Sequence, residues 1–488
     1  MIRKRFLSSL ITAPMAVLML TTSCNNSYPG IYYEPDEDVP SNNEDLNIEA
    51  TPIKIYTRNP AFFSLSTRGT RGTGAFDNTD TKMFDNATFH VFAFRAGTGA
   101  DGTGGQGTLT MPVDLTYTAY SPNHEAAGDR LNSSCLIDGE DRNLGMPFKF
   151  LADGSTIVGS DSQYGTLEPK VDYKVYYSGT YQDIGYNFFG YYIDDWKPTS
   201  QNTTRAQDHI TYHVDLDGNR DLLYGHADQL KVADFEKDGA YYDLNLPKEE
   251  VDRILGMAGG YSTYSGHRNV HPVIRMKHAL TQLVFQAYPG NVSANRVRIT
   301  GIDVEAAKTA NMKVAGRKYD ECGIESFSDE KSTFKLCDRK TTPDDNGVYP
   351  INTNGFNTEY RLAFDESAEK QEVTRLGTSL LVAPAKNYKV TLHYTFEKEG
   401  TLAPNEDRYA KFDAVYYLSA PENDGVSVDA NGNRMFMPGV MYNIKIGVFG
   451  LEKIVMDSAV EGWTDGGGIV VDPDNDDYTT PPAEVRRR

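Results

Sequence analysis

Apolar and polar residues alternate along many short segments of this chain, and a two-residue period predicts β-strands with one buried face. The stretch ATFHVFAF (87–94) is such a segment, and in YNFFGYYID (186–194) almost every position is apolar or aromatic. Further strands are predicted in HPVIRMKHALTQLVFQAY (271–288), RVRITGIDVEAA (296–307), TSLLVAP (378–384), NYKVTLHYTF (387–396) and VMYNIKIGVFGLEKIVM (440–456). The pattern therefore predicts an all-β protein.

A helical period occurs in one clear place, LPKEEVDRILGMAGG (246–260). Pro247 suits the first turn of a helix, and Gly259 is a stop signal. A segment rich in Gly, Ser and Tyr follows at 259–266, and we take it as a domain boundary. Many short strands with one short helix predict two β-sandwich domains in tandem, at 72–262 and 270–465, rather than the βαβ order of a Rossmann or barrel enzyme.

Composition and charge narrow the function classes. A hydrophobic fraction of 39% is enough to bury a core. The chain has 68 acidic and 48 basic residues and a net charge of −20, so it lacks the excess of basic residues that a nucleic-acid-binding protein needs. Cys322 and Cys337 could form a disulfide in an oxidising compartment. Two free thiols are the alternative.

The first 24 residues have the pattern of an export signal. Three basic residues precede a mostly apolar stretch, which ends in small residues and Cys24. This resembles a bacterial lipoprotein signal, in which Cys24 receives lipid, although Thr21 stands where the strict pattern has Leu. An ordinary signal peptide is the alternative. No later segment has the 18 apolar residues of a membrane-spanning helix.

The segment after Cys24 reads as an acidic tether, and a short strand follows it around Ile53 and Ile55. Next comes LSTRGTRGTGAF (65–76), which places two arginines among small residues and has no apolar period. By itself this stretch is typical of a solvated surface loop.

No motif supports catalysis. The serine hydrolase motif GxSxG and the zinc protease motif HExxH are both absent. HRNVH (267–271) offers two imidazoles, but Pro272 disfavours the helix that would bring them together. DLDGNRD (215–221) resembles a calcium loop. However, the EF-hand pattern has Gly at its sixth position, and Gly218 occupies the fourth, so we favour a hairpin turn. We therefore expect no enzyme activity, no metal and no cofactor.

Several segments together resemble the fimbrillin-like lipoproteins, the Mfa-like branch of the type V pilins of Gram-negative anaerobes. The resemblance spans nearly the whole chain. Its motifs are the leader with Cys24, STRGT (66–70), YNFFGYY (186–192), DLLYG (221–225), MKHALTQLVFQ (276–286), SLLVAPAKNYKVTLHY (379–394), MPGVMYNIKI (437–446) and VEGW (460–463). The resemblance implies two transthyretin-like β-sandwiches.

The resemblance also implies a route of assembly. Such subunits reach the outer membrane as lipoproteins with a palmitate-type anchor, and an arginine-specific protease then removes the first strand. Here the tether and removable strand would span 25–71, and the cleavage candidates are Arg71, Arg68 and Arg58. A strand from a neighbouring fimbrial subunit then fills the gap. The donor would lie in the extension 466–488, at Ile469, Val470 and Val471, for which a disordered terminus is the alternative.

Three functions follow from these observations. The first is a structural subunit or tip or accessory adhesin of a fimbria at the cell surface. The second is an outer-membrane lipoprotein that binds host or bacterial glycans and uses its Tyr-rich strands for stacking. The third and weakest is a glycan-active enzyme that uses paired carboxylates. The sequence does not separate stalk, tip and anchor subunits, although the Gly-rich insertion at 97–107 favours a tip or accessory subunit.

Overall fold

The structure is a computed structural model of the 488-residue chain. Some predicted site residues lie outside the residues that it describes, and what is predicted for them stays a prediction: Cys24, Arg68, Arg71 and the segment 469–471. The described residues are 53–58, 88–96, 135–137, 144–151, 164–169, 177, 185–193, 196–237, 239–257, 260–342, 351–400, 402, 406–421, 426–451, 453–461 and 484–487.

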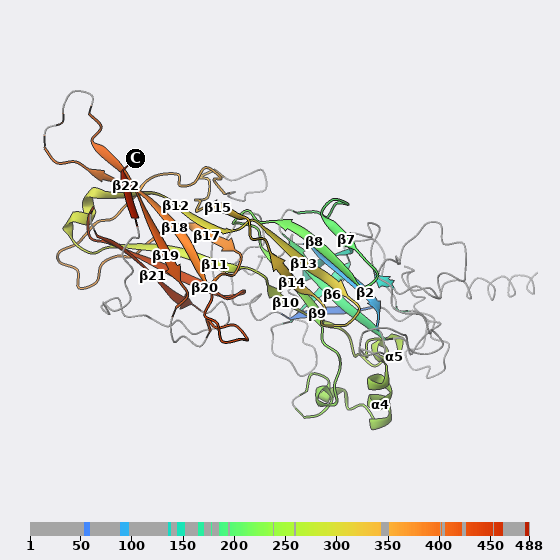
Figure 1. Cartoon of the computed structure of the whole chain (residues 1–488). Coiled ribbons are helices and arrows are strands. Elements are labelled where there is room, and N and C mark those ends of the chain that lie inside the picture. The colour runs from blue at the N-terminus through green and yellow to red at the C-terminus, as the bar shows by residue number, and fades with distance from the viewer. Residues whose placement is uncertain are drawn as a thin grey trace, which may run out of the picture.

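The described residues confirm the all-β prediction, and Figure 1 shows their strands in two groups along an elongated molecule. The largest sheet has eight strands in the order β3-β2-β4-β5-β1-β10-β9-β6, and β2 also pairs with β6, so the sheet closes into a ring. Its strands are β1 (Ile55–Arg58), β2 (Thr88–Arg95), β3 (Cys135–Ile137), β4 (Met146–Leu151), β5 (Tyr164–Pro169), β6 (Tyr186–Ile193), β9 (Leu222–Ala227) and β10 (Val273–His278).

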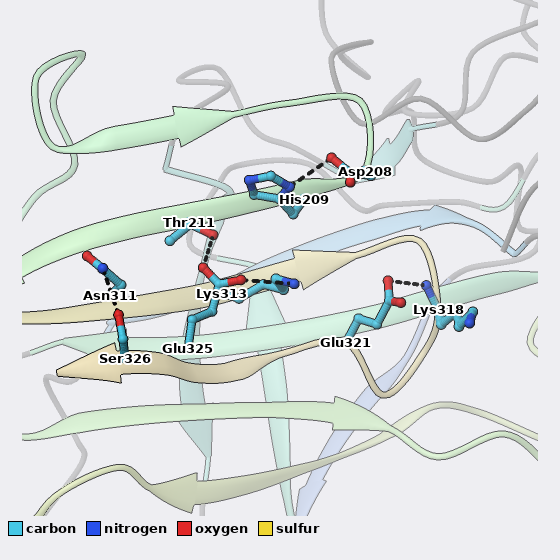
Figure 2. A network of polar contacts seen from close by, with 9 residues as sticks. All are labelled: Asp208, His209, Thr211, Asn311, Lys313, Lys318, Glu321, Glu325 and Ser326. Atoms are coloured by element: carbon cyan, nitrogen blue, oxygen red, sulfur yellow. Dashed lines mark hydrogen bonds and ion pairs between the residues drawn. The ribbon is translucent and has the colours of Figure 1, made fainter. Parts of the chain in front are cut away.

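A four-stranded sheet in the order β14-β13-β8-β7 completes the N-terminal group. Its strands are β7 (Thr203–Arg205), β8 (His209–Asp215), β13 (Thr309–Gly316) and β14 (Gly323–Phe327). Its apolar face shares a core with the ring, where the rings of Tyr212 and Tyr191 lie 5.1 Å apart. Its other face is polar: Glu325 accepts a hydrogen bond from Thr211 and pairs with Lys313 at 3.0 Å (Figure 2). The two faces differ because successive side chains of a strand point to opposite sides of the sheet.

The C-terminal group is a sandwich of two sheets whose facing side chains belong to one core. One sheet has the order β17-β11-β20-β21, with β11 (Thr281–Pro289), β17 (Thr374–Val382), β20 (Met441–Val448) and β21 (Ile454–Glu461). The other has the order β15-β12-β18-β19-β22, and β16 also pairs with β12. Its strands are β12 (Val297–Ala307), β15 (Lys331–Lys335), β16 (Tyr360–Arg361), β18 (Asn387–Glu397), β19 (Tyr409–Ser419) and β22 (Glu484–Arg487).

The sheets do not divide where the sequence placed the domain boundary. β10, β13 and β14 fall within 270–465, yet they pair with strands of the N-terminal group. The chain passes between the groups at 279–280, at 308 and at 328–330. Near the first crossing, Nδ1 of His278 lies 2.9 Å from a carboxylate oxygen of Asp221, and both side chains are buried.

The predicted helix is confirmed as α4 (Lys248–Gly256), and a helix of one turn, α5 (Thr263–Gly266), follows it. Short 3-10 turns occupy η2 (Val232–Asp234), η3 (Tyr242–Leu244) and η4 (Val292–Arg296). The helices lie between β9 and β10 and project from the N-terminal group (Figure 1). Ile254, Met257 and Tyr261 pack into the core inside the ring, so the helical segment covers that core.

The structure corrects the disulfide alternative, because Cys322 and Cys337 are both free thiols. Cys322 directly precedes β14 in the N-terminal group, whereas Cys337 follows β15 in the C-terminal group. Burial raises the pKa of the Cys322 thiol to about 12. The Cys322 thiol is therefore protonated and unreactive at neutral pH.

Candidate functional site

The first strand occupies a place inside the ring rather than at an edge. β1 runs antiparallel to β5, with Ile55 opposite Leu167. On its other side it runs parallel to β10, with Tyr56 opposite Val273. The backbone N–H of Tyr56 also donates to the carbonyl of Pro272 at 3.0 Å. The strand therefore links two strands that do not pair with each other, and it completes the closed ring.

The apolar residues of this segment are core residues. Ile55 has 0% exposure and Ile53 has 8%, and both belong to the cluster inside the ring with Phe89, Val91 and Ile274. Lys54, between the two isoleucines, is exposed. Full burial of an isoleucine side chain contributes about 1.5–3 kcal/mol. Two isoleucines thus account for a substantial part of what holds β1 in place.

A titratable group lies beside this strand. The ring of Tyr56 is 6.1 Å from that of His271, which is 6% exposed. Nδ1 of His271 is buried and has no hydrogen-bond partner among the described residues. Burial, together with the smaller effect of the nearby charge of Lys54, lowers the pKa of His271 to about 4. The imidazole is therefore neutral at physiological pH.

β1 fills a gap between two strand edges. Without β1, the facing edges of β5 and β10 would present unpaired backbone groups, and the pockets of Ile53 and Ile55 would open to solvent. Unpaired edges of this kind bind another extended segment by adding it to the sheet. The site is therefore a slot for one short strand, with two pockets for apolar side chains.

The candidate cleavage residues fall at different places relative to this slot. Arg58 is the last residue of β1, and its backbone is paired with Arg275 on one side and with Tyr164 on the other. A backbone held in a ladder on both sides does not fit the extended binding cleft of a protease. Arg68 and Arg71 belong to the undescribed segment between β1 and β2.

Two other predictions from the sequence, on the turn at 215–221 and on the tyrosines of β6, can be compared with the structure. The turn interpretation of 215–221 is correct, because a carboxylate oxygen of Asp217 accepts from the backbone N–H groups of Asn219 and Arg220. The turn is not a hairpin, since β8 and β9 belong to different sheets. The tyrosines of β6 are all buried, so they pack the core and are not available to stack on a glycan.

No group of three or more His, Cys, Asp or Glu side chains in this part is arranged to hold a metal ion. No helix in this part is both long and apolar enough to cross a membrane.

The sequence favours a structural or surface role for His271 over a metal site, but it gives no signal that this imidazole lies beside β1. The alternation around Ile53 and Ile55 predicts the short strand β1, but it does not predict the strands that pair with β1.

Comparison with known proteins gave matches among solved structures only. No family model and no curated protein matches the chain. A putative cell adhesion protein from Bacteroides uniformis matches at 10% identity with a TM-score of 0.37, covering 85% of this chain and 98% of that one.

Two fimbrial proteins of Porphyromonas gingivalis also match. The tip fimbrial protein Mfa3, with a C-terminal truncation, has 8% identity, a TM-score of 0.27, and coverage of 85% of this chain and 100% of its own. The fimbrial anchor protein Mfa2 has 9% identity, a TM-score of 0.24, and coverage of 84% and 98%.

Proposed function

We propose that this chain is a subunit of a surface fimbria, in a structural, tip or accessory adhesin role. It is exported as a lipoprotein through Cys24, trimmed after an arginine and assembled by strand exchange. One observation carries the proposal: β1 fills an interior position of a closed ring, between β5 and β10, yet it precedes β2 by a long segment that contains Arg68 and Arg71.

Cleavage after Arg68 or Arg71 separates β1 covalently from the rest of the ring. β1 is then held by noncovalent contacts, which include its backbone hydrogen bonds and the burial of Ile53 and Ile55. A four-residue strand held in this way can exchange with a competing segment. Arg71 and Arg68 are therefore the preferred cleavage sites, and Arg58 ranks third because its backbone is paired on both sides.

A neighbouring subunit supplies the replacement strand from its extension 466–488, with Ile469, Val470 and Val471 as the inserted residues. Short apolar side chains suit pockets that isoleucines occupied before. Because donor and acceptor are different segments of each subunit, the contact is head-to-tail and builds a filament instead of a closed dimer.

The test is controlled trimming of the purified chain. An arginine-specific protease is added, the new N-terminus is sequenced, and size is followed by light scattering and electron microscopy. We expect a start at Gly69 or Gly72 and filaments after trimming. Arg68→Ala/Arg71→Ala should resist this cleavage and stay monomeric.

A chain truncated after residue 465 tests the donor and should be trimmed without polymerising. The proposal fails if the form that begins at Gly72 remains monomeric and is as resistant to heat as the untrimmed protein, because the ring would then have no gap to fill.

A further inference from the structure

A polar pocket of about 390 Å³ lies on the C-terminal sandwich, on the face of the six-stranded sheet turned away from the core. Its lining includes Gly301 and Asp303 of β12, Lys335 of β15, His393 and Thr395 of β18, and Lys411 of β19. The segment at Asn354 and Glu359 also contributes to it. Its volume is in the range of small-ligand sites. It lies in a different sheet from β1, so the inference goes beyond assembly and does not depend on strand exchange.

A local irregularity of β12 makes room for the pocket. The register of β12 against β18 shifts between Ile299 and Gly301, and Gly301 lies opposite His393. A Cβ atom at position 301 would come within 3.2 Å of Cδ2 of His393. The absence of a side chain at Gly301 therefore leaves space beside the imidazole, as glycines at bulges commonly do.

His393 is held rigidly by two carboxylates. Its Nε2 lies 3.0 Å from Asp303, and its Nδ1 lies 2.6 Å from Asp413. Burial alone would lower the pKa of His393, but hydrogen bonds and charges from Asp303 and Asp413 outweigh it, so the pKa is raised. With both nitrogens engaged, the imidazole fixes the orientation of the carboxylates and is not itself free to bind a ligand.

Two buried oxygens of the pocket residues have no hydrogen-bond partner among the described residues. Thr395 is only 4% exposed, and its hydroxyl is one of them. The second is Oδ1 of Asp303. Buried polar atoms are nearly always hydrogen-bonded, so each such atom calls for a partner. Thr395 shares its side of β18 with His393, because successive residues of a strand alternate between faces. Its hydroxyl therefore belongs to the pocket side of the sheet.

Two ammonium groups complete the pocket. Lys335 and Lys411 are exposed, and neither ammonium group forms an ion pair or hydrogen bond within the part of the chain that the structure describes. Lys389 of the same sheet, by contrast, pairs with Glu305. The acidic Glu359 of the pocket lies 3.2 Å from Arg298, so its charge is compensated. The pocket thus presents uncompensated positive charge beside groups that accept hydrogen bonds.

We infer that this pocket binds a single sugar residue that carries a carboxylate, of the sialic or uronic acid class. Lys335 and Lys411 neutralise the carboxylate, while Asp303 and Thr395 engage neighbouring hydroxyls. A sugar acid fits because it offers one anionic group and several hydroxyls that both donate and accept. Inorganic phosphate matches the two ammonium groups but lacks the array of alcohol hydroxyls that a sugar acid offers to Asp303 and Thr395. A free amino acid has matching charges but too few hydroxyls.

The test uses the untrimmed, full-length chain. Binding of N-acetylneuraminic acid, glucuronic acid, glucose, glycine and inorganic phosphate is measured by saturation-transfer NMR and calorimetry. We expect at least one sugar acid to bind, and glucose to bind about ten-fold more weakly, since one charge-assisted hydrogen bond contributes about 1.5–3 kcal/mol. Lys335→Ala/Lys411→Ala should lose binding by a similar factor. Lys331→Ala/Lys340→Ala, which removes the same charge elsewhere, should retain it.

Gly301→Ala tests the pocket without changing charge, and it should weaken binding because the new methyl group fills the space beside His393. Thermal unfolding of every variant shows that it remains folded. The inference is overturned if no sugar acid binds, or if phosphate or glycine binds equally well. It is also overturned if sugar-acid binding survives both Gly301→Ala and the loss of Lys335 and Lys411. None of these outcomes bears on whether trimmed chains polymerise.

Discussion

The ring of Tyr56 on β1 lies 6.1 Å from the imidazole of His271, with the two planes tilted by 47°. His271 stands two residues before β10, the strand against which β1 pairs in parallel. The exchangeable strand that we propose therefore packs beside a buried group that must stay neutral. Any condition that charges this imidazole opposes the seating of β1.

The first prediction concerns pH. The pKa of His271 is lowered by burial to about 4 in the folded chain, against an ordinary value of 6.5. The stability that the neutral imidazole contributes is therefore complete above pH 6.5, and it is lost as the pH falls from 6.5 toward 4. By linkage, lowering the pH from 7.5 to 5 should cost about 2 kcal/mol through this residue. Chemical denaturation at both pH values measures the loss.

His271→Phe is the matched control, because phenylalanine keeps a ring beside Tyr56 but does not titrate. The carboxylates of the protein titrate alike in both chains. The difference between the chains in the stability lost at low pH therefore comes from His271. An equal loss of stability in the two chains would contradict the assignment.

The second prediction concerns the burial of β1. Ile55 is fully buried, so Ile55→Ala should lower the free energy of unfolding by about 2–5 kcal/mol. Lys54→Ala changes the exposed neighbour on the same strand, and it should alter stability by no more than about 0.5 kcal/mol. Equilibrium unfolding in urea compares them. Equal effects of the two substitutions would show that β1 does not use its isoleucines to stay in the ring.

Local patterns predicted much of the fold. Alternation identified β2, β12, β18 and β20, a nearly continuous apolar run identified β6, and the start and stop signals around 247–259 identified α4. They did not predict the crossing at 279–280. There HPVIRMKHALTQLVFQAY keeps its apolar character through a change of sheet, since Ala279 and Leu280 are buried between the two groups. A two-residue period reports which side chains are buried but not the sheet to which a strand belongs.

Local sequence patterns could not predict the pocket on the six-stranded sheet for a related reason. Gly301, Lys335, His393 and Lys411 come from four strands and span more than a hundred positions of the sequence. Each is unremarkable where it stands, and only the pairing of β12 with β15 and β18, and of β18 with β19, brings them together. By contrast, the first strand was found because Ile53 and Ile55 lie in one local pattern.

The third prediction uses two glycines with opposite environments. A Cβ atom at Gly225 of β9 would lie 2.2 Å from the backbone carbonyl oxygen of Arg275 in β10. Gly225→Ala must therefore push the two strands apart, and it should lower stability by roughly 1–3 kcal/mol or more. At Gly256, the last residue of α4, nothing lies within 4 Å of an added Cβ. Gly256→Ala should raise stability by about 0.5–1 kcal/mol. Thermal melts measure both, and a Gly225→Ala variant as stable as the unaltered chain would refute the close packing of β9 on β10.

The last prediction concerns His393, whose pKa moves in the opposite direction from that of His271. Burial works against the charged imidazole, but Asp303 and Asp413 favour it more strongly, so its pKa lies above 6.5 in the folded chain. The stability from this array is then complete below pH 6.5, and it is lost as the pH rises through the folded value.

Asp413→Asn removes one of the two carboxylates while keeping the size of the side chain. The titration midpoint of His393, followed by NMR of its ring protons, should fall in this variant. Asp208→Asn is the control, because Asp208 lies beside His209 on the other sandwich and leaves His393 untouched. If His393 in the unaltered chain titrates below 6.5, or if Asp413→Asn leaves its midpoint unchanged, the two carboxylates do not hold the imidazole as the structure describes. The orientation of Asp303 in the sugar pocket would then lose its support.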